Sequence, residues 1–259
     1  MDTIREKIER LKASAGQAQI VLVTKTVSPE KIREALVSGL LDLGENRVQE
    51  LLEKQAALQA ETQIRWHMIG HLQTNKVKQV VGRVALIHSL DRMELAEEIE
   101  RQAVLKQIKT VPCLIQVNSS GEASKFGLKP EAVEAFVAGL QTKAIQIRGL
   151  MTIGPNIFSC HPREGGDPKS LMDSRLRRSD GSAPVDEAAD RRSSSRRGND
   201  KIRQAFRETR ELRDRLKKKF SNHRWDILSM GMSSDYTIAI EEGATLIRVG
   251  TAVFGNRPK

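Results

Sequence analysis

Short hydrophobic runs alternate with amphipathic segments along the chain. The first run, Ile20-Val21-Leu22-Val23, contains only β-branched or aliphatic residues and ends abruptly at Thr24-Lys25-Thr26. Four apolar residues without polar alternation are typical of a strand covered on both faces, as in a parallel sheet. Together with seven later runs, the pattern predicts strands at 20–25, 40–43, 64–69, 84–88, 111–117, 145–150, 225–228 and 246–249.

Helix-forming sequence follows each predicted strand, and the crossovers are long enough for parallel pairing. Eightfold alternation of strand and helix predicts a closed α/β barrel, and 259 residues suit that fold. Aromatic residues make up only 3% of the chain, so we expect an aliphatic core. Polar and glycine-rich residues gather after the strands, which predicts a functional face built from the strand-to-helix loops.

One stretch, 158–199, breaks this pattern. It is rich in Ser, Arg, Asp, Gly and Pro with few apolar anchors, and such a segment does not bury enough surface to offset its ordering entropy. Part of it resembles translated mobile palindromic repeats. We therefore expect a single barrel domain formed by 1–157 and 200–259, with 158–199 a low-complexity, disordered insertion. Cys160-His161 lacks a second ligand pair at metal-binding spacing, so no metal site is predicted.

The net charge of +10 raises the possibility of a nucleic-acid partner. Residues 201–219 alone hold nine Lys or Arg against three Asp or Glu. The same segment places Ile202, Phe206, Leu212 and Leu216 at near-helical spacing, so an amphipathic helix with a basic solvated face explains the charge better. No aromatic platform or helix-turn-helix pattern accompanies it.

The start of the chain is charged and periodic, without the apolar core of a signal peptide, and no apolar stretch of membrane-spanning length occurs. The two cysteines, Cys113 and Cys160, make no disulfide framework and indicate a reducing compartment. A soluble, cytoplasmic protein is expected.

Lys25 ends the first predicted strand, where α/β barrels place their ligand chemistry. Desolvation at that rim would lower the pKa of its ammonium and make the amine available to a carbonyl. On position alone, a strand cap that reaches solvent is an equal alternative.

Two loops suit a phosphate. Ser229-Met230-Gly231-Met232-Ser233 enters a helix as a small-residue turn, and Gly250-Thr251 follows the last strand. Backbone N–H groups and hydroxyls of such turns converge on anions, and barrels commonly hold phosphate after strands seven and eight. Ordinary tight turns are the alternative. A lysine facing this cradle across the barrel mouth suits a phosphorylated aldehyde.

With these features in place, the chain resembles the pyridoxal phosphate (PLP) homeostasis protein family, racemase-like single-barrel proteins that bind PLP. The resemblance covers everything except about 158–199. It rests on long motifs in order: Thr24-Lys25-Thr26, Gly44-Glu45-Asn46-Arg47-Val48-Gln49-Glu50, Trp66-His67-Met68-Ile69-Gly70-His71-Leu72-Gln73-Thr74-Asn75-Lys76, Ser124-Lys125-Phe126-Gly127, Arg148-Gly149-Leu150-Met151, Ser229-Met230-Gly231-Met232-Ser233 and Arg248-Val249-Gly250-Thr251-Ala252-Val253-Phe254-Gly255.

The resemblance implies a (β/α)8 TIM barrel of the alanine-racemase N-terminal-domain type, PLP fold type III. It implies that Lys25 forms an internal aldimine with PLP and that Arg248 faces the pyridine nitrogen. The other cofactor-binding residues implied are Asn46, His67, Met232, Ser233, Gly250 and Thr251. For His67 a structural role beside Trp66 is an equal alternative. Lys125 either hands PLP on, binds it secondarily or is a plain surface lysine, and Val27 stands where some relatives carry a second lysine.

Three functions follow as hypotheses. The first is a monomeric PLP carrier, with PLP-dependent apoenzymes as candidate partners, without strong turnover or a catalytic residue set. The second is an amino-acid racemase; two-base racemases of this fold take their second base, a tyrosine, from an added β domain, whereas the sole tyrosine here, Tyr236, follows the phosphate loop. The third, a basic nucleic-acid-binding protein, depends on the 201–219 helix alone.

Overall fold

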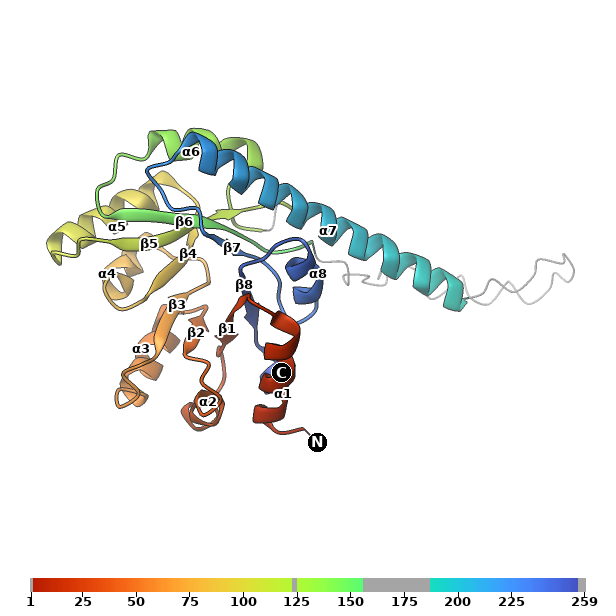
Figure 1. Ribbon diagram of the computed structural model, residues 1–259. Coiled ribbons are helices and arrows are strands. Elements are labelled where there is room, and N and C mark those ends of the chain that lie inside the picture. The colour runs from red at the N-terminus through yellow and green to blue at the C-terminus, as the bar shows by residue number, and fades with distance from the viewer. Residues whose placement is uncertain (1, 123–124, 156–186, 256–259) are drawn as a thin grey trace, which may run out of the picture.

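The computed structural model describes residues 2–122, 125–155 and 187–255. Eight parallel strands close into a barrel in chain order, with helices on its outside (Figure 1). The predicted (β/α)8 barrel is therefore confirmed. The strands are β1 (Gln19–Val23), β2 (Asp42–Glu45), β3 (Arg65–Met68), β4 (Leu86–Leu90), β5 (Val111–Val117), β6 (Ile145–Thr152), β7 (Ile227–Ser229) and β8 (Leu246–Val249).

The helices connect the strands across the outside of the barrel. α1 begins with a capping box between Thr3 and Glu6, and Pro29 occupies the first turn of α2. None of the helices in the described ranges is both long and apolar enough to cross a bilayer. They are α1 (Ile4–Ala15), α2 (Pro29–Leu36), α3 (Val48–Ala57), α4 (Val77–Val80), α5 (Met93–Leu105), α6 (Val133–Gly139), α7 (Glu187–Lys219), α8 (Tyr236–Glu241) and α9 (Thr251–Phe254), with 3₁₀ turns η1 (Thr74–Lys76) and η2 (Pro130–Ala132).

Three strands lie about two residues later than the hydrophobic runs predicted. β2 occupies 42–45 rather than 40–43, β4 occupies 86–90 rather than 84–88, and β7 occupies 227–229 rather than 225–228. Pairing explains the shift in β2, because Asp42 lies opposite Arg65 and Glu45 opposite Met68 in β3. Strand position is thus fixed by ladder partners more than by local hydrophobicity.

The two faces of the strands form separate cores. Outward residues such as Leu22 and Ile87 pack with the helices in one large, mainly aliphatic cluster. Inward residues form a small apolar cluster inside the barrel: Val21, Leu86, Leu114, Met151 and Leu246. Buried polar side chains, among them His88 and Arg248, also lie inside the barrel and lead to the site.

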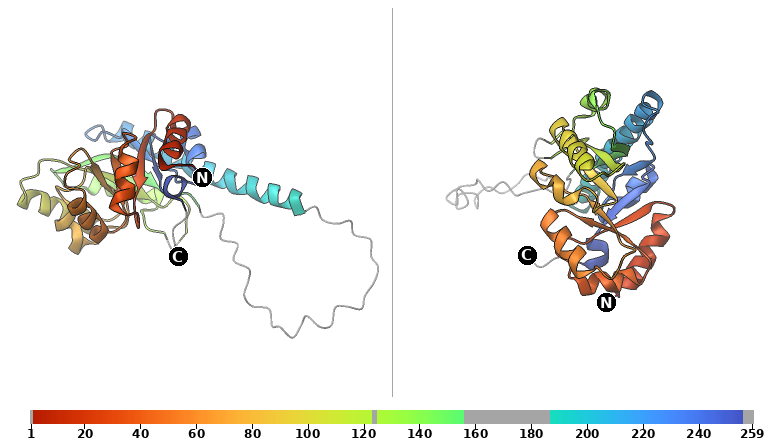
Figure 2. Two further views of the ribbon diagram at one scale, coloured as in Figure 1. Left: turned by 90° about the horizontal axis from the view of Figure 1, so that it is seen from below. Right: turned by 90° about the vertical axis from the view of Figure 1, so that its left-hand side faces the viewer.

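α7 combines a confirmed prediction with a correction. Its apolar face is buried as predicted, at Ile202, Phe206, Leu212 and Leu216. The helix begins at Glu187, however, and its first turns extend beyond the barrel (Figures 1 and 2). This helical backbone differs from the lack of regular structure expected for 187–199, because the helix of 201–219 continues toward the N-terminus through this segment. Residues 158–186 of the expected insertion, with Cys160 and His161, lie outside the described residues.

Gly149 allows β6 and β7 to approach each other. Its φ is +144°, and a Cβ there would lie 1.7 Å from the carbonyl oxygen of Ile227. That conformation is essentially restricted to glycine. The β5–β6 register also shifts between Cys113 and Leu114, beside this residue.

We expect Gly149→Ala to lower the free energy of unfolding by at least about 3 kcal/mol, because backbone strain and a backbone clash add. Gly39→Ala is the matched control, since Gly39 also has positive φ but open space around a Cβ. It should lose about 1 kcal/mol. Urea denaturation of both variants measures the difference, and equal losses would show that the clash is absent.

Candidate functional site: a cavity at the ends of β1, β7 and β8

A cavity of about 240 Å³ opens beside the carboxyl ends of β1, β7 and β8. Six of the eight residues predicted to bind a cofactor lie together in its wall. The full lining comprises Val23, Lys25, Met232, Ser233, Ser234, Arg248, Gly250 and Thr251. The loops after strands seven and eight therefore meet the end of strand one, as closed-barrel topology requires.

Lys25 is half-buried in a tight turn directly after β1. The N–H of Thr24 still donates to the carbonyl of Gly44 in β2 (3.1 Å), so the ladder continues to the residue before the lysine. Thr26 then has φ +61°. A β-branched residue rarely adopts this left-handed conformation, which indicates that surrounding contacts enforce the turn.

Arg248 in β8 supplies a buried positive charge at the cavity. Its Nη1 donates to Ser229 Oγ (2.6 Å), and its Nη2 donates to the carbonyl of Thr152 (2.8 Å). Burial lowers the pKa of Arg248 to about 10, against the opposing effect of Asp235. The guanidinium therefore remains protonated at neutral pH and acts as a donor only.

Backbone donors gather at the other end of the cavity. The N–H groups of Gly250 and Ala252 both donate to Ser233 Oγ, each at 3.2 Å. The turn that presents Ser233 is held by Asp235, whose Oδ1 accepts the N–H of Met232 (2.6 Å). A hydroxyl and two converging N–H groups form a donor set suited to an anion such as phosphate.

A hydrogen-bonded chain crosses the barrel interior from Arg248. Ser229 Oγ lies 3.2 Å from His88 Nδ1, His88 Nε2 lies 3.0 Å from His67 Nδ1, and His67 Nε2 lies 3.0 Å from Asp42 Oδ1. Arg248 only donates, so Ser229 accepts from it. At the other end, the Asp42 carboxylate only accepts, so His67 donates to it from Nε2.

The surroundings of His88 and Asp42 set the charge of each of these two side chains. Complete burial, and then the neighbouring charges of His67 and Arg248, lower the pKa of His88 well below its usual value, so it is neutral. Burial alone would raise the pKa of Asp42. Hydrogen bonds from Arg65 (2.6 and 2.7 Å) and His67 outweigh burial and hold that pKa well below its usual range.

Two predicted site residues lie elsewhere. Asn46 follows β2 outside the lining of the cavity, and its backbone is so close to Gly70 that a Cβ there would lie 2.2 Å from the Asn46 carbonyl oxygen. His67 is buried in the interior chain. For His67 the contacts match the structural alternative, although its partners are Asp42 and His88.

The sequence reasoning missed Asp42, His88 and Ser229. A signal was present, because polar residues at alternate positions of an otherwise apolar buried strand point to the inner face. His88 alternates with Ile87, which packs outward against the helices. The prediction treated each strand as uniformly covered and did not separate its two faces.

Lys125 also lies outside the cavity lining. Its Nζ donates to Glu122 Oε1 (2.7 Å) and to the carbonyl of Gly154 (2.8 Å). Next to it, the exposed Phe126 ring stacks on His71 with 3.9 Å between centroids. Lys125 thus ties the loop after β5 to the end of β6.

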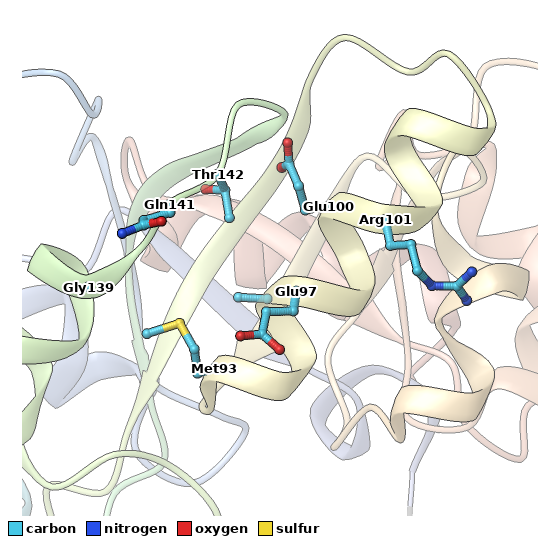
Figure 3. A pocket seen from close by; sticks show the side chains of 8 residues that line it. Met93, Glu97, Glu100, Arg101, Gly139, Gln141 and Thr142 are labelled. Carbon is cyan, nitrogen blue, oxygen red and sulfur yellow. The ribbon is translucent and has the colours of Figure 1, made fainter.

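A second cavity, of about 380 Å³, lies between α5 and the end of α6 (Figure 3). Although larger, it has charged groups already used in the fold: Glu100 accepts the N–H groups of Lys143 and Ala144, and Arg101 pairs with Glu98. It is therefore a less suitable site than the first cavity. Its lining comprises Met93, Ala96, Glu97, Glu100, Arg101, Gly139, Gln141 and Thr142.

Comparisons with known proteins bear on this geometry. Residues 1–258 match the family described as alanine racemase, N-terminal domain. The pyridoxal phosphate homeostasis protein of Aquifex aeolicus is 40% identical over 258 residues, covering 99% of this chain and 95% of that protein. Its Pseudomonas aeruginosa counterpart is 35% identical over 269 residues, covering 99% and 97%.

Solved structures of similar proteins have the same barrel fold. PipY of Synechococcus elongatus PCC7942, with PLP bound, has a TM-score of 0.74 and 30% identity, covering 98% of this chain and 100% of that chain. Alanine racemase from Corynebacterium glutamicum has a TM-score of 0.62 at 13% identity, covering 98% and 61%. This second likeness concerns the fold alone.

The interior chain yields a stability prediction. We expect Asp42→Asn to lower the free energy of unfolding at neutral pH by about 2 kcal/mol, because Arg65 and His67 lose the buried carboxylate to which they donate. The loss is moderate because Arg65 is exposed to solvent, which screens its charge. The folded pKa of Asp42 is depressed, so its contribution is present above its ordinary pKa of 3.8 and is lost as pH falls through the folded value. The difference in free energy of unfolding between wild type and Asp42→Asn should therefore narrow below about pH 4.

Asp226→Asn is the matched control for urea denaturation across this pH series. Asp226 also faces an arginine fork, from Arg148, but its side chain is 39% exposed against 7% for Asp42. It should lose clearly less stability. A gap for Asp42→Asn that stays constant into acid would contradict the depressed pKa.

Proposed function

The chain belongs to the alanine racemase N-terminal domain family and, within it, to the pyridoxal phosphate homeostasis proteins, and from this premise we propose that it binds PLP reversibly in the β1–β7–β8 cavity. By holding PLP, it limits the free aldehyde in the cell without strong catalytic turnover. The observation that carries the proposal is that one cavity joins a primary amine, Lys25, to the anion-binding donors at Ser233 and Gly250.

The residues present fit this cofactor. When bound, PLP supplies an aldehyde that condenses with a primary amine. Lys25 supplies that amine, and Ser233, Gly250 and Thr251 would hold the phosphate. Support comes from the converging N–H groups at Ser233 Oγ, since a phosphate oxygen accepts from the same donors.

Arg248 would contact the ring nitrogen of the cofactor. A protonated guanidinium donates there and does not transfer its proton, so the pyridine nitrogen stays unprotonated. An unprotonated ring is a poorer electron sink, which favours storage over carbanion chemistry. The Ser229 and Thr152 contacts hold the guanidinium in place for that role.

We propose that racemisation is weak for a second reason. A two-base racemase needs a second proton-transfer group at the cofactor. The only tyrosine of the chain, Tyr236, lies outside the cavity lining, and its hydroxyl is 3.2 Å from Ser14 Oγ in α1. This contact supports a structural role for Tyr236.

The remaining parts of the proposal are a monomer in the cytoplasm and PLP-dependent apoenzymes as recipients. The barrel residues 1–157 and 200–259 form the binding unit, and 158–199 has no assigned part in it. Nucleic-acid binding is disfavoured because the basic face of α7 is partly neutralised: Arg203, Arg207 and Arg210 pair with Glu242, the residue that follows α8.

We expect purified protein mixed with PLP and gel-filtered to keep a visible absorbance band, and borohydride to convert it into a covalent adduct on Lys25. Lys25→Ala should lose band and adduct entirely, because the amine is removed. Absorbance and peptide mass spectrometry of the reduced protein measure this.

Lys125→Ala is the control lysine, placed outside the cavity but near the barrel mouth. It should retain the adduct at wild-type level. An adduct that disappears in Lys125→Ala and persists in Lys25→Ala would refute the assignment of Lys25.

Turnover separates a carrier from a racemase. We expect the PLP-loaded protein to convert L-alanine to D-alanine at least about 10³-fold more slowly than a two-base racemase, because one proton-transfer group is lacking. Tyr236→Phe should leave that residual rate and the adduct unchanged. Chiral chromatography of the products measures the rate, and a rate that falls in Tyr236→Phe would place the tyrosine in a reaction.

A further inference from the structure

A buried cluster of opposite charges lies behind Lys25, which we call the Lys54 cluster: Lys54 and Glu50 of α3, and Glu45 of β2. Lys54 Nζ donates to Glu45 Oε1 (2.7 Å), to Glu50 Oε2 (3.2 Å) and to the backbone carbonyl of Thr24 (2.6 Å). Its three donors therefore all have partners. None of the three residues belongs to the cavity lining.

The Lys54 cluster holds both peptide groups that flank Lys25. On one side, Lys54 binds the carbonyl of Thr24, whose hydroxyl also donates to Glu45 Oε1 (2.6 Å). On the other side, Glu50 Oε2 accepts the N–H of Thr26 (2.9 Å). With both peptide planes fixed, the direction in which Lys25 leaves the backbone is fixed as well.

The enforced turn explains why such contacts are present. Thr26 has φ +61°, a conformation that a β-branched residue does not hold by itself. Two bonds hold this turn: the Thr26 N–H donates to Glu50, and the Val27 N–H donates to the Thr24 carbonyl (2.9 Å). Loss of the Glu50 bond would leave the Thr26 peptide group without its side-chain restraint and let the lysine shift with it.

The charges themselves make a purely stabilising role a poor explanation. Glu45 is fully buried, and its Oε2 has no hydrogen-bond partner within the described part of the chain. Burial raises the pKa of Glu45, against the opposing bonds from Lys54 and Thr24. Apolar residues in such a place are often at least as stabilising as a buried ion pair, so what the charges supply is defined geometry.

We propose that the Lys54 cluster is a positioning device that sets the Thr24–Thr26 turn so that the Lys25 amine meets the aldehyde of the cofactor. Glu45, Glu50 and Lys54 are positioning residues, since they act through the backbone of the turn. The inference rests on the proposed function, because it assigns the cluster a role at that same site.

Glu50 allows a sharp test, since it is partly exposed and its replacement leaves the barrel core intact. Glu50→Leu removes the acceptor for the Thr26 N–H, whereas Glu50→Gln keeps an acceptor oxygen. Glu53→Leu is the matched control on the same helix, where the exposed Glu53 accepts a hydrogen bond from Gln49 and makes none to the Thr24–Thr26 turn among the described residues. Each variant is titrated with PLP and with pyridoxine 5′-phosphate, which has the same phosphate and ring but an alcohol in place of the aldehyde.

We expect Glu50→Leu to weaken formation of the borohydride-reducible PLP adduct about five- to tenfold, the effect of losing one ordering hydrogen bond. Its affinity for pyridoxine 5′-phosphate should stay at the wild-type level, because the phosphate donors are untouched. Glu50→Gln and Glu53→Leu should match wild type with both ligands. Lys54→Met should behave as Glu50→Leu, and circular dichroism reports whether it folds.

Three results would overturn the proposal. If Glu50→Leu formed the adduct as wild type does, the cluster would not position Lys25. An equal loss with both ligands would mean that the cluster shapes the whole cavity. If wild type itself gave no reducible adduct, the proposed function would fall and the inference with it, which distinguishes that failure from the first two.

Discussion

The polar interior of the barrel is arranged around the hydrogen bonds of one buried guanidinium, that of Arg248. Arg248 stays charged, so every group near it must accept a hydrogen bond or carry compensating charge. The structure meets this demand with Ser229, the Thr152 carbonyl and the nearby charge of Asp235. From Ser229, the His88 and His67 side chains continue the hydrogen bonds to Asp42 near the opposite end of the barrel. Arg248 and Asp42 thus lie at the two ends of one hydrogen-bonded series, and Arg248 is the end that lines the cavity.

Much of this arrangement could be predicted from the sequence. Apolar runs followed by helix-forming segments identify eight parallel strands, and parallel strands bring their carboxyl ends to one rim. Lys25, Ser233 and Gly250 follow strands one, seven and eight, so closure of the barrel alone places them side by side. The same logic gave the buried face of α7, including Ile202 and Phe206.

The rest depended on information that hydrophobic runs do not contain. The start of β2 is set by its partner Arg65 in β3, and the inward direction of His67 and His88 depends on that register. The Lys54 cluster is likewise invisible in a linear pattern, because it joins α3 to the ends of two strands. Even Glu187, the first residue of α7, lies in sequence whose composition resembles an insertion more than a helix.

The neighbourhood of α1 has a consequence for the topology of the molecule. α1 packs against α9, so the first and last helices of the described chain are neighbours in space (Figure 1). The link between β6, which ends at Thr152, and α7, which begins at Glu187, is the longest between consecutive elements of the chain. Circular permutation, in which the two ends of the chain are joined and the chain is opened between β6 and α7, would therefore preserve every strand pair of the barrel. For a circularly permuted chain of that kind, the barrel would begin at α7 and end at β6, with Lys25 in its middle.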